Sequence, residues 1–155
     1  MSSLGERYLK ERGVAFAAHE YDFRKKGAEA AAESLGLPLD AMLKTLVVRL
    51  DDGRCVLLLV PGNKQVSMRS FARALEVRGA ELASERDAER LTGYQVGGIG
   101  PFGTRTALSV FVDLSAVEHE TLYVNGGRRG LILGLAQADL LRAAQAELVD
   151  VGLEL

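Results

Sequence analysis

Two segments near the middle of the chain predict a buried β-hairpin. Residues 44–50 and 55–60 are dominated by apolar and β-branched side chains, and they flank the sequence Asp-Asp-Gly-Arg at residues 51–54. The Asp-Gly pair provides the positive φ that a tight hairpin turn requires. Because apolar residues follow one another without regular alternation, we expect both faces of the hairpin to be covered. The hairpin is therefore expected at the centre of a sheet, with helices packed against it.

Helical signals occur on both sides of this hairpin. Residues 3–12 have apolar positions at helical spacing before Gly13, and residues 28–35 are rich in alanine and end at Gly36. Ser67 and Ser84 are placed to cap two further helices, the second ending at Gly93. The remaining predicted elements are strands beginning at residue 14 and over residues 107–112, 121–124, 131–135 and 148–151, a helical turn over residues 114–118, and a helix over residues 137–146.

Composition narrows the class of protein. With 48% hydrophobic and 26% charged residues, we expect one compact domain over residues 1–155. A net charge of −2 argues against a protein that coats nucleic acid or anionic membranes by charge alone. The apolar segments are far shorter than the roughly 20 residues of a membrane-spanning helix. A single cysteine, Cys55, and a first segment without an apolar signal core predict a cytoplasmic setting.

Glycine is the one residue type in excess. Seventeen of the 155 residues are glycine, where about 11 would be usual at roughly 7%, and many lie in residues 97–103 and 126–130. Gly98, Gly100 and Gly103 match the pattern G-x-G-x-x-G, but we reject a dinucleotide site because Pro101 interrupts the loop and a strand is expected next. The segment is either a structural turn or a loop whose backbone N–H groups approach a ligand.

The search for catalytic motifs leaves Lys44 as the main candidate. At the start of the first hairpin strand, its ammonium is either a solvated strand end or a cation placed for a phosphate, carboxylate or carbonyl oxygen. His19 and His119 lack further ligands at metal-binding spacing, so we predict no metal and no cofactor. Cys55 lies within an apolar segment, which is typical of a packed side chain rather than a nucleophile.

Basic residues follow the glycine-rich segments and the first predicted strand. They lie at residues 24–26, at Arg105 and at residues 128–129. Each group is ordinary solubilising surface unless the fold gathers them around one pocket. In that case they would form a local phosphate-binding rim, suited to the end of a nucleic acid rather than to its length.

Four segments together resemble a known family. They are His-Glu-Tyr at residues 19–21, Leu-Lys-Thr-Leu-Val-Val at 43–48, Thr-Gly-Tyr-Gln-Val-Gly-Gly-Ile-Gly-Pro-Phe-Gly at 92–103, and Tyr-Val-Asn-Gly-Gly-Arg-Arg-Gly-Leu at 123–131. In this order and spacing they resemble the YbaK/EbsC family of aminoacyl-tRNA deacylases. These proteins are free-standing relatives of the editing domain inserted in bacterial prolyl-tRNA synthetases.

The resemblance implies a fold and an activity. The expected fold is a mixed α+β domain with a barrel-like, largely antiparallel central sheet flanked by helices. The expected reaction is hydrolysis of the ester that joins a mischarged amino acid to tRNA, most often cysteine or alanine on the proline tRNA. The implied partners are the aminoacylated 3′ end of tRNA and, as a candidate, prolyl-tRNA synthetase, with neither a membrane nor DNA.

The resemblance also implies roles for individual residues. Lys44 matches the family's essential lysine, and Gly97 and Pro101 match the ends of its G-x-x-x-P loop, so these three are predicted catalytic residues. Tyr21 matches an aromatic residue beside the pocket. The family precedent has the 2′-hydroxyl of the tRNA, or the thiol of a bound cysteine, assist the reaction. The other predicted substrate-binding residues are Thr45, Gly98, Ile99, Gly100, Gly126, Gly127 and Arg128.

Two positions depart from the family pattern. Gly100 stands where many members have serine, and Ile132 stands where many have an acidic residue. Both departures bear on which amino acid is accepted. Two other functions stay open from the sequence: a module that binds a nucleotide or tRNA end without turnover, and an adaptor to a synthetase.

Overall fold

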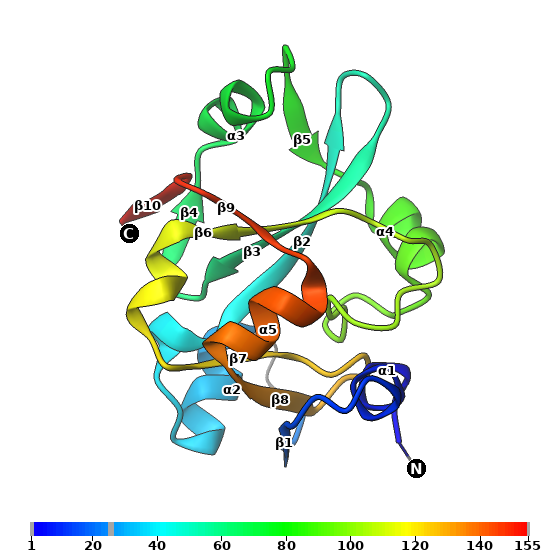
Figure 1. The fold of residues 1–155 in the computed structure, drawn as a ribbon, viewed down its shortest axis with the longest axis vertical. Coiled ribbons are helices and arrows are strands. Elements are labelled where there is room, and N and C mark those ends of the chain that lie inside the picture. The colour runs from blue at the N-terminus through cyan, green and yellow to red at the C-terminus, as the bar shows by residue number, and fades with distance from the viewer. Residues whose placement is uncertain (1, 25–26, 155) are drawn as a thin grey trace.

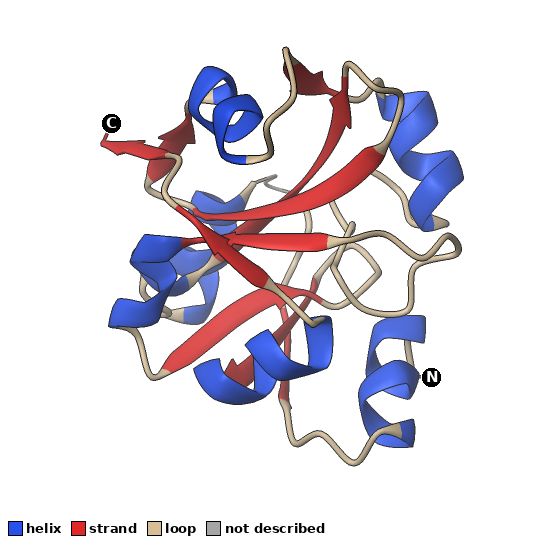
Figure 2. Cartoon of the chain, turned by 45° about the horizontal axis from the view of Figure 1, so that its top comes forward, coloured by secondary structure: helices blue, strands red, loops and turns tan. Residues whose placement is uncertain are grey.

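A computed structural model describes residues 2–24 and 27–154 of the chain (Figure 1). Its strands confirm the predicted mixed α+β class, with helices arranged around the strands (Figure 2). The strands are β1 (Ala17–Glu20), β2 (Leu43–Leu50), β3 (Cys55–Pro61), β4 (Lys64–Val66), β5 (Ala80–Leu82), β6 (Val110–Asp113), β7 (Thr121–Asn125), β8 (Leu131–Ala136), β9 (Glu147–Val149) and β10 (Gly152–Glu154).

The helices begin and end largely where their caps predict. Ser67 and Ser84 each accept a hydrogen bond from the backbone three residues later, at 3.1 Å. Gly36 and Gly93 adopt the left-handed conformation at the ends of their helices, with φ of +67° and +78°. The helices are α1 (Leu4–Glu11), α2 (Ala28–Leu35), α3 (Met68–Ala74), α4 (Glu85–Thr92) and α5 (Gln137–Ala144), with short 3-10 turns η1 (Leu39–Ala41) and η2 (Leu114–Glu118).

The predicted hairpin is confirmed as β2 and β3, which pair antiparallel at the centre of a five-stranded sheet of order β5-β2-β3-β6-β9. Successive residues of β3 enter different hydrophobic clusters. Leu57 and Leu59 pack into the larger cluster, whereas Leu58 and Val60 pack into a second cluster on the opposite face, and all four side chains are fully buried. Both faces of the hairpin are therefore covered, as the continuous apolar pattern predicts.

A second sheet joins the first strand to two later ones, in the order β1-β8-β7, and a short ribbon pairs β10 with β4. One isolated bridge, between Met42 and Tyr123, links the second sheet to the start of β2. The expectation of a barrel is corrected by this arrangement. The described strands lie in three separate sheets without closing, and β6 pairs parallel to both β3 and β9. Strands β5 and β9 are the edges of the larger sheet.

Several boundaries differ from the sequence prediction. The first strand begins at Ala17 rather than residue 14, and β6 begins at Val110 rather than residue 107. Helix α5 ends at Ala144 because Gln145 turns the chain with φ of +51°. The three-residue strands β4, β5 and β10 were not predicted, since so few residues carry no periodic signal. No helix in the described part of the chain is long and apolar enough to cross a membrane.

Asp113, at the end of β6, anchors the C-terminal ribbon. Its carboxylate is buried and accepts the N–H groups of Val151 at 3.0 Å and Gly152 at 2.7 Å. The backbone N–H and hydroxyl of Ser115 donate to the other carboxylate oxygen. Burial alone would raise the pKa of Asp113, but these hydrogen bonds outweigh burial and hold the pKa below its ordinary value. The carboxylate thus fixes β10 beside β4.

We expect Asp113→Asn to lower the free energy of unfolding by about 2 kcal/mol at pH 7, since hydrogen bonds to a buried charge are lost or weakened. Because the folded pKa is depressed, the carboxylate's contribution is present above the unfolded pKa of about 4 and disappears as pH falls through the folded value. The variant should therefore lose less stability than the wild type on acidification. Urea denaturation from pH 7 to pH 3 measures this difference, with exposed Asp150→Asn as the control. Equal acid sensitivity of Asp113→Asn and wild type would contradict the prediction.

Candidate functional site

The two glycine-rich segments lie against each other, backbone to backbone. The Nδ2 of Asn125 donates to the carbonyl oxygen of Ile99 at 3.1 Å. A Cβ placed on Gly100 would lie 2.1 Å from the carbonyl oxygen of Asn125, and one on Gly98 would lie 2.7 Å from the backbone nitrogen of Arg129. These glycines therefore permit a contact between loops that a side chain would prevent.

Tyr94 and helix α1 hold the paired loops in place. The hydroxyl of Tyr94 donates to the carbonyl oxygen of Phe102 at 2.5 Å, and burial raises the pKa of Tyr94 to about 12. The phenol is therefore neutral, and its hydrogen bond holds the two ends of the segment at residues 94–102 together. The buried hydroxyl of Ser3 donates to the carbonyl oxygen of Gly126 at 2.6 Å. Both loops are thus fixed by hydrogen bonds to their backbone carbonyls.

A cavity of about 180 Å³ opens between the start of β2, helix α2 and these loops. Four residues predicted from the sequence line it together: Tyr21, Lys44, Thr45 and Gly97. Asn125 and a largely apolar wall complete the lining. The other lining residues are Gly27, Ala28, Ala31, Met42, Leu43 and Ile132.

Lys44 brings a cation to this cavity. Its side chain is half-buried, and its Nζ donates to the carbonyl oxygen of Lys64 at 2.6 Å. Burial lowers the pKa of Lys44 below its ordinary value. An ammonium carries three N–H donors, and among the described residues only the carbonyl of Lys64 accepts from it, so two donors stay available for a ligand's oxygen atoms. The backbone of Lys64, in strand β4, therefore holds the ammonium of Lys44 through one of its three N–H groups.

Thr45 and Tyr21 add two hydroxyl groups. Thr45 lines the cavity, and its Oγ1 is fully buried with no hydrogen-bond partner among the described residues. The backbone N–H of Tyr21 donates to the carbonyl oxygen of Gly130 at 2.9 Å, which ties the end of β1 to the second glycine loop. Burial raises the pKa of Tyr21, so its phenol stays neutral.

The other predicted residues do not line the cavity. Pro101 is a buried residue of the first loop, and Gly127 packs against the ring of Tyr94. Arg128 is exposed and pairs with Glu20 at 2.7 Å. Residues Gly98, Ile99, Gly100 and Gly126 are buried. Of the basic segment at residues 24–26, residues 25 and 26 lie outside the described part of the chain.

Sequence reasoning missed part of the lining. Asn125 lies just beyond the strand predicted over residues 121–124, but it is the last residue of β7 and contacts both the cavity and the first glycine loop. A polar residue that ends an apolar strand beside two glycines is the signal that could have identified it. Ala28, Ala31 and Met42 carried no such signal, because apolar residues of a pocket wall and of a core look alike in sequence.

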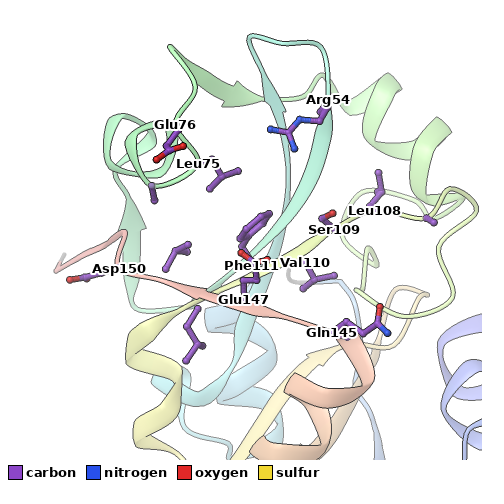
Figure 3. A pocket seen from close by; sticks show the side chains of 15 residues that line it. Arg54, Leu75, Glu76, Leu108, Ser109, Val110, Phe111, Gln145, Glu147 and Asp150 are labelled. Atoms are coloured by element: carbon purple, nitrogen blue, oxygen red, sulfur yellow. The ribbon is translucent and has the colours of Figure 1, made fainter.

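A larger hollow lies elsewhere and contains none of the predicted residues. Its volume is about 850 Å³, and it lies between the end of α3 and strand β9, above β6 (Figure 3). Arg54 and Glu76 border it on one side, and Gln145 and Glu147 on the other (Figure 3). Its charged groups come from separate edges of a broad groove, whereas four of the predicted residues, Lys44 among them, line the smaller cavity together. We therefore place the candidate site in the smaller cavity.

The chain is similar to proteins and domains named for tRNA editing. It is 26% identical over 147 residues to EbsC of Enterococcus faecalis, a proposed Cys-tRNA(Pro)/Cys-tRNA(Cys) deacylase, covering 94% of this chain and 90% of that protein. It is 31% identical over 108 residues to a proline-tRNA ligase of Geobacter metallireducens, covering 70% of this chain and 18% of the ligase.

The fold and the family agree with these relatives. A crystal structure of a proposed trans-editing enzyme for prolyl-tRNA synthetase has the same fold, with a TM-score of 0.88, 23% identity and 99% of both chains covered. A sequence profile of the aminoacyl-tRNA editing domain family matches residues 24–143, well over half of the chain. The resemblance to YbaK/EbsC proteins is confirmed, and the chain belongs to the aminoacyl-tRNA editing domain family.

Proposed function

We propose that this chain hydrolyses the ester between a small, mischarged amino acid and the 3′-terminal ribose of a tRNA. Cysteine and alanine on the proline tRNA are the first substrates to test. The observation that carries the proposal is that the half-buried Lys44, whose ammonium donates to the carbonyl oxygen of Lys64, lines one small cavity together with Tyr21, Thr45 and Gly97. The similarity to EbsC supports the same substrate class.

The size and lining of the cavity favour a small aminoacyl group. Its volume of about 180 Å³ is close to the cavity of about 150 Å³ that holds a benzene-sized molecule. It is smaller than the roughly 300 Å³ at which drug-sized pockets begin. Ala31, Met42 and Ile132 give it an apolar wall, and no carboxylate is among its described lining residues. Because this volume must hold the backbone atoms of the aminoacyl group as well as its side chain, a large aromatic side chain fits poorly, and the apolar wall without a carboxylate disfavours a cationic one.

The reaction needs charge stabilisation more than a strong nucleophile. As water attacks the ester carbonyl, negative charge develops on the carbonyl oxygen. The free N–H groups of Lys44 can donate to that oxygen, and a donor fixed before the reaction stabilises the transition state strongly. The backbone of Gly97 has a φ of +96°, which residues other than glycine rarely adopt, and it forms part of the cavity wall. The hydroxyl next to the ester on the ribose can supply a proton to the leaving oxygen and regain one from the attacking water, so the ribose is restored and the released amino acid carries the new carboxylate.

A deacylation panel tests the proposal. We expect proline tRNA charged with cysteine or alanine to lose its amino acid at least about 10-fold faster than phenylalanine tRNA charged with phenylalanine, because one poorly fitting group costs about 1–3 kcal/mol. Release of radiolabelled amino acid from each charged tRNA measures the rates, and proline on proline tRNA is the cognate control. Binding of these tRNAs without ester loss on any of them would contradict the proposal and favour a non-catalytic module.

A further inference from the structure

Phe23 and Arg129 lie at the rim of the candidate cavity. Gly97 lines the cavity, and a Cβ placed on it would lie 2.6 Å from the Cζ of Phe23 and 3.5 Å from the Nε of Arg129. The guanidinium carbon of Arg129 lies 5.2 Å from the centroid of the Phe23 ring. An aromatic ring and a planar cation therefore meet directly beside the opening.

Arg129 keeps its charge available for a ligand. Its Nε donates to the carbonyl oxygen of Val96 at 3.0 Å, which fixes the guanidinium at the rim. Within residues 2–24 and 27–154, no carboxylate forms an ion pair with it. The neighbouring arginines differ, because Arg128 pairs with Glu20 and Arg24 pairs with Asp22. Arg129 is exposed, so its remaining N–H groups face solvent.

We propose that Phe23 and Arg129 form a stacking platform for the nucleobase of the 3′-terminal nucleotide of the tRNA. The inference rests on the proposed function and extends it to the bound RNA. A cavity of about 180 Å³ has room for an aminoacyl group but not for the nucleoside that carries it. The terminal nucleotide must then lie at the rim. Unpaired RNA bases are commonly held by stacking on aromatic rings and guanidinium planes, and the arginine can also contact phosphate.

The test compares two short RNAs, one ending in the unpaired 3′ sequence of tRNA and one lacking only the terminal base. Stacking of one base on an aromatic ring corresponds to about a 5- to 100-fold difference in affinity. We expect the wild type to show such a preference for the base-bearing RNA, measured by fluorescence anisotropy. Phe23→Leu should remove the preference while its affinity for the abasic RNA stays unchanged, which a general loss of structure would not produce.

Two further variants complete the test. Arg129→Gln keeps the ring and should reduce the preference, so the proposal stays testable if Phe23→Leu does not fold. Arg49→Gln is the matched control, because Arg49 is an exposed arginine five residues beyond Lys44 on β2, paired with Glu81. It should bind both RNAs as the wild type does.

The outcomes separate this inference from the proposed function. A wild type without preference for the base-bearing RNA, or an undiminished preference in both Phe23→Leu and Arg129→Gln, would overturn the platform. If the wild type hydrolyses charged tRNA in either of these cases, the proposed function stands without it. If the wild type shows the preference but hydrolyses no charged tRNA, and the variants lose the preference, the platform stands and the proposed hydrolysis fails.

Discussion

Lys44→Ala is expected to slow deacylation of a susceptible aminoacyl-tRNA by about 100- to 1000-fold, the usual cost of removing one fixed donor to a developing oxyanion. Among the described residues the ammonium donates to one acceptor, the backbone carbonyl of Lys64, so its other N–H groups stay free for a ligand in the cavity that Lys44 lines. Its burial already disfavours the charge, as the lowered pKa shows, so removing it should leave the fold stable. Single-turnover deacylation and thermal denaturation measure the two effects.

The control for this substitution is Lys10→Ala, which replaces an exposed lysine of α1 whose one hydrogen-bond partner among the described residues is the hydroxyl of Ser2. It should deacylate as the wild type does. A correctly folded Lys44→Ala protein with full activity would exclude the lysine from the reaction.

The wild-type rate should also decline at alkaline pH after subtraction of spontaneous hydrolysis. Because the pKa of Lys44 is lowered, the ammonium is lost at a lower pH than an ordinary lysine would lose it.

The central fold could be predicted because its signals are local. The hairpin of β2 and β3 follows from continuous apolar residues around an Asp-Gly turn. Ser67 and Ser84 cap their helices through hydrogen bonds to backbone N–H groups three residues later in the sequence. The ribbon of β4 and β10 has no such signal. It joins residues 64–66 to residues 152–154, and its position depends on the buried carboxylate of Asp113. Pairing over that separation is decided by tertiary contacts alone.

The candidate site, like the fold, has a part that the sequence predicts and a part that it does not. Lys44 and Gly97 stand out in the sequence because a cation at a strand end and a glycine-rich loop are unusual. What the sequence does not reveal is the contact between the loops. Asn125 meets Ile99 and Gly100 only once β7 is placed beside the first loop. The acceptor of Lys44 is hidden for a related reason, since it is a backbone carbonyl of the unpredicted strand β4. Backbone groups carry no residue-type signal.

Gly100 gives the second prediction of large effect. We expect Gly100→Ala and Gly100→Ser each to lower the free energy of unfolding by about 3 kcal/mol, at the upper end of the usual cost of overpacking. A Cβ at this position would lie 2.1 Å from the carbonyl oxygen of Asn125, and a backbone carbonyl in a strand cannot move aside as a flexible side chain can. Denaturant unfolding of the purified variants measures the loss.

The serine variant decides between two explanations of the departure from the family pattern. If serine were simply interchangeable with glycine here, Gly100→Ser would unfold like the wild type. If the loops of this chain pack more closely, the variant should be destabilised and should deacylate more slowly, because the displaced loop carries Gly97 at the cavity wall. Gly79→Ala is the matched control: a Cβ there meets nothing within 4 Å and φ is ordinary. Its stability should change by less than about 0.5 kcal/mol, which separates the steric effect at Gly100 from the general effect of replacing a glycine.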